Sequence, residues 1–268
     1  MSIEILLQNI NFSFIKGKKN VDVLENISFE VAEKEFVSIV GPSGCGKTTL
    51  LKIISGLYNS SPTYHLKGKI LVKGKMPSQC RQQNEFGFVF QNPVLLAWKT
   101  VLKNIELPIR ILQAKMPTQN FWQPEELLDM VGLKDFKNAY PFELSGGMQQ
   151  RVALAMALVF KPSILLLDEP FRALDEITRE KLNIELLKIK ERTNATIVLI
   201  THSLQEAVLL SDKVLVLSAR PSTIKEQINI SLPKKRTIDL MGIQQFIHYE
   251  NLLRDYLKEE PSLIEPLK

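Results

Sequence analysis

Hydrophobic residues recur along the chain in short runs that are typical of strands, and helix-length segments separate these runs. Residues 27–31 (ISFEV) alternate apolar and polar side chains, as a half-buried strand does. Residues 36–40 (FVSIV) are almost continuously apolar, as parallel strands are when both faces of their sheet are covered. Similar runs predict strands at residues 69–72, 86–90, 164–167, 196–200 and 213–218.

Helical patterning follows several of these strands. It predicts helices from about residue 46 to 55 and from about 175 to 192. A third helix is expected after residue 200, where Ser203 and Glu206 have the spacing of a capping box. Strands and helices that alternate in this way imply a parallel α/β sheet.

The middle of the chain has a different pattern. Residues from about 100 to 143 form helix-length segments between prolines, and Pro124 stands where the first residue of a helix is expected. We therefore expect a helical subdomain, at about residues 95–160, inserted into an α/β domain of residues 1–232. Residues 233–268 are expected to form a short helical tail with an amphipathic helix from Ile238 to Lys258.

The amino-acid composition excludes some classes of protein but does not identify one. The chain has 268 residues and a net charge of +5, and its lysines are scattered, so it favours neither a nucleic-acid nor a membrane-surface partner. The short basic run of residues 234–236 is expected to be a solvated loop. Two isolated cysteines predict neither a disulfide nor a zinc site and suit a reducing compartment. No secretory signal pattern and no apolar run near 18 residues is found, so any membrane role is expected to be peripheral.

A glycine-rich loop follows the buried strand of residues 36–40 and precedes a helix. Its sequence, GPSGCGKTT, matches the phosphate-binding pattern G-x-x-x-x-G-K-[ST] in the required strand–loop–helix context. Such a loop turns successive N–H groups toward phosphate oxygens. We expect Lys47 to meet the β- and γ-phosphates and Thr48 to offer a hydroxyl to Mg²⁺. The expected nucleotide ligands are Gly41, Pro42, Ser43, Gly44, Cys45, Gly46, Lys47, Thr48 and Thr49.

Two acids end the apolar strand of residues 164–167. A strand that ends in a solvated turn would look the same, but a phosphate loop elsewhere in the chain favours a catalytic role. Asp168 is then expected to reach the magnesium shell, and Glu169 to polarise the attacking water.

A second helix start also has the form of an anion site. Residues 144–150 read LSGGMQQ, with Ser145 as the expected N-cap and Gly146 and Gly147 opening an apolar helix. One triphosphate does not need two such sites, so we expect the second to face the nucleotide of a partner subunit.

These motifs, in their order and spacing, resemble the ATP-binding subunit of ABC transporters over roughly residues 3 to 230. The resemblance implies a P-loop NTPase core with a parallel sheet, an N-terminal antiparallel β subdomain and the helical insertion. It implies that Gln91 occupies the glutamine loop and serves catalysis and Mg²⁺, that His202 is the switch histidine, and that Asp175 lies in the loop crossing a dimer interface. Phe14 is placed like the aromatic that stacks on adenine, although Phe12 could compete.

Smaller features resemble the nitrate, sulfonate and taurine importers within that family, among them residues 92–109 and Met148. Arg172 is a departure, because that group has a small residue there, and its direction is left open. The resemblance implies an ATPase that uses ATP and Mg²⁺, forms a homodimer, binds integral membrane permease subunits and serves a solute-binding protein indirectly. It also implies a peripheral location at the cytoplasmic face of the inner membrane, and no nucleic-acid partner.

Two other classes remain open at this point. One is a soluble ABC-type ATPase acting on nucleic acid or ribosomes, which usually carries a long coiled-coil insertion or a second cassette. The other is a nucleotide-binding regulator without turnover, against which the presence of both Glu169 and His202 argues.

Overall fold

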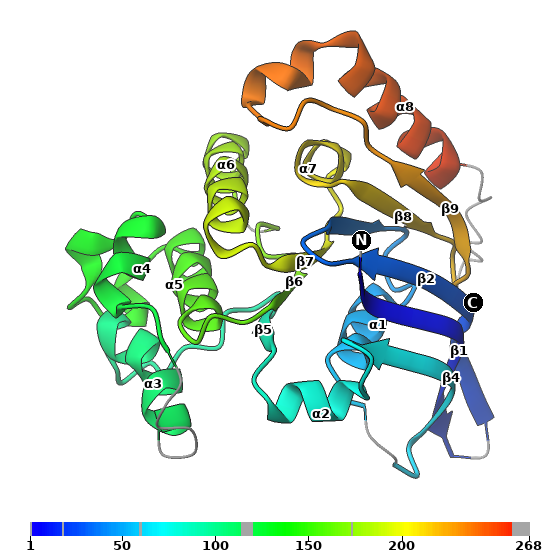
Figure 1. Ribbon diagram of the computed structural model, residues 1–268, viewed down its shortest axis with the longest axis horizontal. Helices are drawn as coiled ribbons and strands as arrows, with labels where there is room; N and C mark the ends of the chain where they lie inside the picture. Colours follow the sequence, from blue (N-terminus) through cyan, green and yellow to red (C-terminus); the bar gives the residue numbers. More distant parts are fainter. Residues whose placement is uncertain (1, 18, 59–60, 114–119, 173, 259–268) are drawn as a thin grey trace, which may run out of the picture.

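The computed structural model describes residues 2–17, 19–58, 61–113, 120–172 and 174–258. Its described residues form two sheets with helices around them (Figure 1). The larger sheet has the strand order β5-β6-β7-β3-β8-β9, in which all neighbours run parallel except β9, which is antiparallel to β8. Its strands are β3 (Phe36–Val40), β5 (Phe86–Val89), β6 (Ile164–Asp168), β7 (Thr196–Ile200), β8 (Lys213–Leu217) and β9 (Ile224–Asn229).

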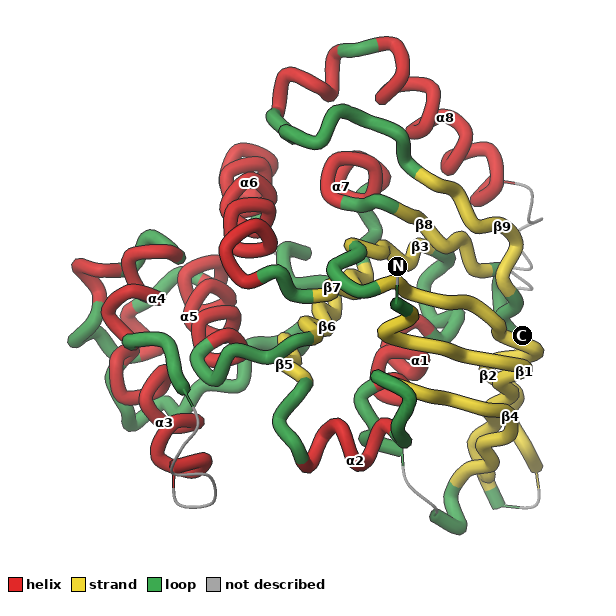
Figure 2. The backbone as a smooth tube through the Cα atoms, viewed as in Figure 1, coloured by secondary structure: helices red, strands yellow, loops and turns green. Residues whose placement is uncertain are grey.

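The smaller sheet is antiparallel and comes from the N-terminal part of the chain. Its order is β2-β1-β4, and Figure 2 shows its strands beside helix α1. The bounds are β1 (Ile3–Lys16), β2 (Lys19–Ala32), β4 (Tyr64–Val72) and α1 (Lys47–Ile54). The predicted fold, a parallel P-loop sheet with an N-terminal antiparallel subdomain, is confirmed.

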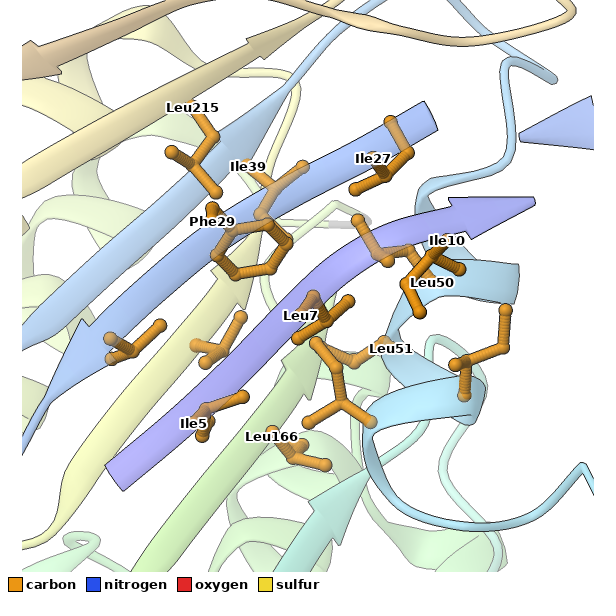
Figure 3. Close-up of a cluster of buried hydrophobic side chains, with 14 of the residues drawn as sticks. Ile5, Leu7, Ile10, Ile27, Phe29, Ile39, Leu50, Leu51, Leu166 and Leu215 are labelled. Atoms are coloured by element: carbon orange, nitrogen blue, oxygen red, sulfur yellow. The ribbon is translucent and has the colours of Figure 1, made fainter. Parts of the chain in front are cut away.

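One hydrophobic cluster joins the two sheets through α1. Ile5 and Leu7 of β1, Leu50 and Leu51 of α1 and Leu166 of β6 lie together in Figure 3, and each is at most 1% exposed. Burying a leucine side chain of this kind stabilises a fold by about 1.5–3 kcal/mol. The cluster thereby fixes α1, and the loop before it, against the ends of the central strands.

The other face of the parallel sheet is covered by a group of helices. Residues of β6 and β7 that alternate with those facing α1, such as Leu165 and Leu199, pack in a second core with the helices of the insertion. Strands buried on both faces explain their continuous hydrophobicity. The helices are α3 (Val101–Gln113), α4 (Pro124–Met130) and α5 (Gly146–Leu158), followed by α6 (Glu176–Thr193), while the short α2 (Pro77–Gln82) lies near β4.

The C-terminal part of the chain packs beside the β8–β9 side of the larger sheet (Figure 1). The predicted helix 238–258 is divided into a 3-10 turn (Ile238–Gly242) and α8 (Gln244–Lys258). Phe246 and Leu253 of α8 are fully buried in a third core that contains α7 (Leu204–Leu210). The division of the chain near residue 232 stays a prediction, and residues 259–268 lie outside the described part.

Three local expectations differ from the structure. Glu206 does not complete a capping box with Ser203, because its carboxylate hydrogen-bonds Thr201 instead. Arg236 is not a solvated loop residue: it donates to the carbonyls of Val208 and Ser211 at the end of α7. Strand β9 was not predicted, since its mixed sequence IKEQIN lacks a strong strand pattern. None of the described helices is both long and apolar enough to span a membrane.

Candidate functional site

The site lies where four parallel strands end. Because β5, β6, β7 and β3 are successive neighbours, the segments after them meet at one edge of the sheet, where α/β proteins bind ligands. Gln91 follows β5, Glu169 follows β6, His202 follows β7 and the glycine-rich loop follows β3. They enclose a cavity of about 300 Å³, which is lined by Val23, Ser43, Gly44, Gly46, Lys47, Thr48, Thr49, Gln91, Glu169, Arg172, His202 and Arg220.

The glycine-rich loop has the backbone that phosphate binding requires. Gly44 and Gly46 adopt φ angles of 75° and 116°, and a Cβ on Gly46 would lie 2.7 Å from Cγ1 of Val23 in β2. The φ angle of Gly46 favours glycine, and any other residue there would also have to displace the Val23 and Leu24 side chains. The Lys47 ammonium donates to the carbonyls of Gly41 and Pro42, each at 2.8 Å, so it crosses the mouth of the loop. Cys45 is 1% exposed and is a packing residue of the loop.

Thr48 of α1 and Asp168 at the end of β6 place two side-chain oxygens next to each other. The Thr48 hydroxyl donates to the Asp168 carboxylate over 3.0 Å. Burial raises the pKa of Asp168, and the Thr48 hydrogen bond partly opposes this effect. The described residues contain no group of three or more His, Cys, Asp or Glu side chains that could cage a metal. A magnesium ion held by few protein oxygens and by substrate phosphates fits this donor set.

Glu169 is held by three donors from three segments. Its Oε1 lies 2.5 Å from Nε2 of His202, and its Oε2 lies 3.1 Å from both Nε2 of Gln91 and Nη1 of Arg172. Its φ angle of 47° is left-handed, which is uncommon for a residue with a side chain and turns the carboxylate toward the cavity. The structure therefore brings Glu169, His202 and Gln91 together, while the catalytic roles expected of them stay predictions.

Arg172, whose direction the sequence left open, pairs with Glu169 of its own chain. The guanidinium is 60% exposed and lines the cavity beside the phosphate loop. Because most of this cation faces solvent, the pair is worth at most about 1 kcal/mol.

The LSGG segment lies apart from this cavity. Ser145 accepts a hydrogen bond from the Met148 N–H and caps α5, and both Ser145 and Gly146 are exposed. Gly147 is buried against Leu174, since a Cβ there would lie 2.5 Å from Cδ2 of Leu174. Ser145, Gly146 and Gly147 do not line the phosphate cavity.

Asp175 and Phe14 also lie outside the cavity lining. Asp175 is the exposed N-cap of α6, and the hydrogen bond from the Thr178 N–H holds the pKa of its carboxyl below the ordinary value. Ala173, which precedes it in the loop, lies outside the described residues. Phe12 is 1% exposed and packs with its ring edge-on to Phe14, which is half-buried, so the choice between them as the adenine-stacking ring stays a prediction.

Sequence reasoning missed several residues that support the site. The Ser222 hydroxyl donates to the Cys45 carbonyl and so holds the phosphate loop from 177 positions away. Gln150 of α5 donates to the carbonyl of Phe90, next to Gln91, over 3.0 Å. Neither residue could be recognised from its neighbours in the sequence, because Ser222 simply follows a proline and Gln150 lies inside a helix.

The chain is similar to known proteins over most of its length. An uncharacterised ABC transporter ATP-binding protein of Methanocaldococcus jannaschii is 43% identical over 97% of this chain and 93% of its own. The nitrate import ATP-binding protein NrtD of Synechocystis is 40% identical, over 98% of this chain and 99% of its own. The aliphatic sulfonates import ATP-binding protein SsuB of Bacillus subtilis is 41% identical, over 86% and 87%.

A solved structure of a similar protein has the same fold. The dimeric structure of a bacterial ABC transporter cassette superposes with a TM-score of 0.72 at 32% identity, covering 85% of this chain and all of that one. Residues 24–172 match the model of the family described as ABC transporter. The fold also places the phosphate loop, Glu169 with its three partners and the capped LSGG helix in one domain. This chain belongs to the ABC transporter family and is one of its ATP-binding subunits.

Proposed function

We propose that this chain is the ATP-hydrolysing subunit of an importer and that it drives uptake of a small anionic solute such as a sulfonate or nitrate. The observation that carries the proposal is the placement of Glu169, held by His202 and Gln91, beside the phosphate loop and the Thr48–Asp168 pair. The relatives named for sulfonate and nitrate import support the solute class.

The loop of residues 41–49 would bind the triphosphate. Its backbone N–H groups and the N-terminus of α1 attract anions, and the Lys47 ammonium would exchange its two loop carbonyls for phosphate oxygens. Phe14 would stack on the adenine. Thr48, Asp168 and Gln91 would hold Mg²⁺, which neutralises negative charge on the phosphates when it is bound.

Glu169 would take the proton of the attacking water at its carboxylate. His202 and Gln91 keep both carboxylate oxygens in place, so the base is oriented before the substrate arrives. His202 is 37% exposed, so its ring is able to face the end of the phosphate chain while it contacts Glu169.

A head-to-tail homodimer would complete each site. Ser145, Gly146 and Gly147 form a helix start that does not line the phosphate cavity of the described residues, and Ser145 and Gly146 are exposed. Placed against the phosphates of a partner, they would add N–H donors to the other side of the nucleotide. Asp175 and the loop before it would lie at the same interface. The dimeric cassette with the same fold supports this arrangement.

The membrane subunits would bind next to Gln91 and the helical insertion. Val94 is 67% exposed and Trp98 is 74% exposed, whereas Leu95 packs against the core of the insertion. Phe142, which stacks on Tyr140 just before the LSGG segment, is 75% exposed. Exposed aromatic side chains of this kind mark protein interaction sites. A solute-binding protein would act on the outer side of the membrane subunits, and this chain would stay peripheral on the cytoplasmic side.

The substitution Glu169→Gln tests the proposal. The amide cannot take a proton from water, so we expect phosphate release to fall at least about 100-fold while Mg-ATP still binds, which should trap an ATP-bound dimer. Phosphate release and size-exclusion chromatography with and without Mg-ATP measure both effects.

Glu191→Gln is the matched control, since Glu191 is exposed near the far end of α6. It should hydrolyse ATP like the wild type. Normal turnover by the Glu169→Gln variant would show that another group is the base.

A further inference from the structure

Glu206 is a buried carboxylate that the proposed chemistry does not use. It is 4% exposed in the first turn of α7, and burial raises its pKa. A buried acid is costly unless donors surround it. Its partners come from two sides: the Thr201 hydroxyl donates to Oε2, while Nε of Arg179 in α6 forms an ion pair with Oε1 over 3.7 Å. Asn183, one turn after Arg179, also hydrogen-bonds the carboxylate.

Thr201 connects Glu206 to the loop that carries His202. Its hydroxyl donates to Glu206 and accepts from the Ser203 N–H over 3.0 Å. The two residues that flank His202 are therefore fixed by one hydroxyl, whose direction Glu206 sets. Ser203 also accepts from the Glu206 N–H. We therefore expect a change at Glu206 to disturb the residues on both sides of His202.

Arg179 makes the corresponding contact to the loop before α6. Its Nη2 donates to the Leu174 carbonyl over 2.7 Å. The Leu174 side chain in turn lies on Gly147, so closely that a Cβ on Gly147 would meet Cδ2 of Leu174 at 2.5 Å. The start of α5, the Leu174 loop, Arg179, Glu206, Thr201 and the His202 loop thus form one continuous series of contacts.

This series borders a second cavity, next to the phosphate cavity. It has a volume of about 280 Å³ and is lined by Glu169, Phe171, Arg172, Arg179, Thr201, His202, Ser203 and Glu206. Arg179 and Glu206 therefore stand behind His202 and Glu169, on the side away from the phosphate loop, and neither lines the cavity that holds that loop.

We propose that Arg179 and Glu206 are positioning residues that tie the Gly147 end of α5, through Leu174, to the loop that carries His202. The proposal rests on the proposed function, because His202 acts there on Glu169. In a head-to-tail dimer, the start of α5 contacts the nucleotide bound to the partner, whereas His202 acts at the nucleotide bound to its own chain. The Arg179–Glu206 contact then links the two ATP sites, so that the partner's nucleotide stabilises the catalytic position of His202.

Glu206→Gln is the test variant, since glutamine keeps the size and can still accept from Thr201 but loses the charge that attracts Arg179. In the assembled transporter, we expect kcat to fall about tenfold and KM for ATP to stay within about twofold, because His202 shifts while the phosphate loop does not. Arg179→Gln should have the same effect from the other side of the contact.

A double-mutant cycle separates positioning from a general structural role. In the His202→Ala background, Glu206→Gln should lower the remaining turnover less than twofold, because the residue through which Glu206 acts is gone. Independent, multiplicative losses in the double variant would overturn the proposal. Glu4→Gln is the matched control, because Glu4 is also a buried carboxylate with a pKa raised by burial but lies on β1. It should behave like the wild type.

The imidazole NMR signals give a readout that does not depend on hydrolysis. The chain has three histidines, His65, His202 and His248, so the spectrum is simple and His202→Ala identifies the signal of interest. We expect the His202 signal alone to move in Glu206→Gln and Arg179→Gln. An unchanged His202 signal, or equal shifts of all three, would overturn the proposal. Failure of the wild type to hydrolyse ATP would instead count against the proposed function, while these signals would still report on the contact.

Discussion

At the scale of single residues, Asp168 shows how a functional acid is accommodated at a cost to stability. The carboxylate is 3% exposed at the end of β6, and it has the Thr48 hydroxyl as its hydrogen-bond donor. Burial raises its pKa above the ordinary value of about 3.8, so the folded chain binds this proton more tightly than the unfolded chain. Its contribution to stability is therefore full below that value and is lost as pH rises through the raised pKa.

Asp168→Asn should consequently stabilise the chain at pH 7 in the absence of Mg-ATP, because it removes a buried charge and keeps an oxygen for Thr48. We expect the free energy of unfolding to rise by about 1 kcal/mol, and the difference from the wild type to shrink as pH falls toward 4. Urea titrations across this pH range measure it. Mg-ATP should stabilise the wild type and not the variant, and a less stable variant without nucleotide at pH 7 would contradict the argument.

Arg172 and Glu206 show what sequence could not supply at this scale. Arg172 stands three positions after Glu169, a spacing that allows contact only if the turn folds the two side chains to one side. Glu206 had the spacing of a capping box, yet Thr201 and Arg179 compete for its carboxylate and prevail. Partners from other strands and helices decide where a long polar side chain points.

At the scale of elements, the start of α5 depends on two adjacent glycines with different surroundings. A Cβ on Gly146 would meet nothing within 4 Å, whereas one on Gly147 would meet the end of the Leu174 side chain at 2.5 Å. Alanine is the better helix former by up to about 1 kcal/mol. The sequence GG therefore contains one glycine with open space beside it and one at which a Cβ would have to displace the end of the Leu174 side chain.

We expect Gly147→Ala to lower the free energy of unfolding by about 1 kcal/mol, because Leu174 must shift away from α5. Gly146→Ala is the matched control in the same turn, and it should leave stability unchanged or raise it. Chemical denaturation of the isolated chain compares the two. Equal effects of both substitutions would mean that Leu174 moves without cost.

The elements themselves were largely predictable. The buried strands at residues 36–40, 164–167, 196–200 and 213–218, and the helix that follows the phosphate loop, are confirmed within a residue or two. Their continuous apolar runs are a strong local signal. Strand β9 and the break before α8 carry no such signal, because a polar edge strand and a turn inside an amphipathic segment are stabilised by what they pack against.

At the scale of the whole molecule, the exposed apolar residues of the insertion form its candidate contact with the membrane subunits. Trp98→Ala should weaken co-purification with these subunits about tenfold or more, since exposed tryptophans dominate interface energies, and should leave ATP binding intact. Ile247→Ala is the control, because Ile247 is 46% exposed on α8, which packs against α7 and not against the insertion. Unchanged assembly in Trp98→Ala would place the membrane contact elsewhere.

The sequence by itself determined the fold class, the family and the kinds of side chain that form the site. The strand–loop–helix context of GPSGCGKTT, the acids after residues 164–167 and the LSGGMQQ segment are local patterns, and local patterns are set by backbone conformation and burial along one element.

Only the tertiary structure decided which of these groups meet. The strand order β5-β6-β7-β3 places Gln91 and His202 around the Glu169 carboxylate and leaves the LSGG helix outside the phosphate cavity. The packing also turns Arg172 and Glu206 to partners within the chain. The physical reason is that hydrogen bonds and ion pairs act over about 3 Å, so they depend on the packing of distant segments and not on spacing along the chain.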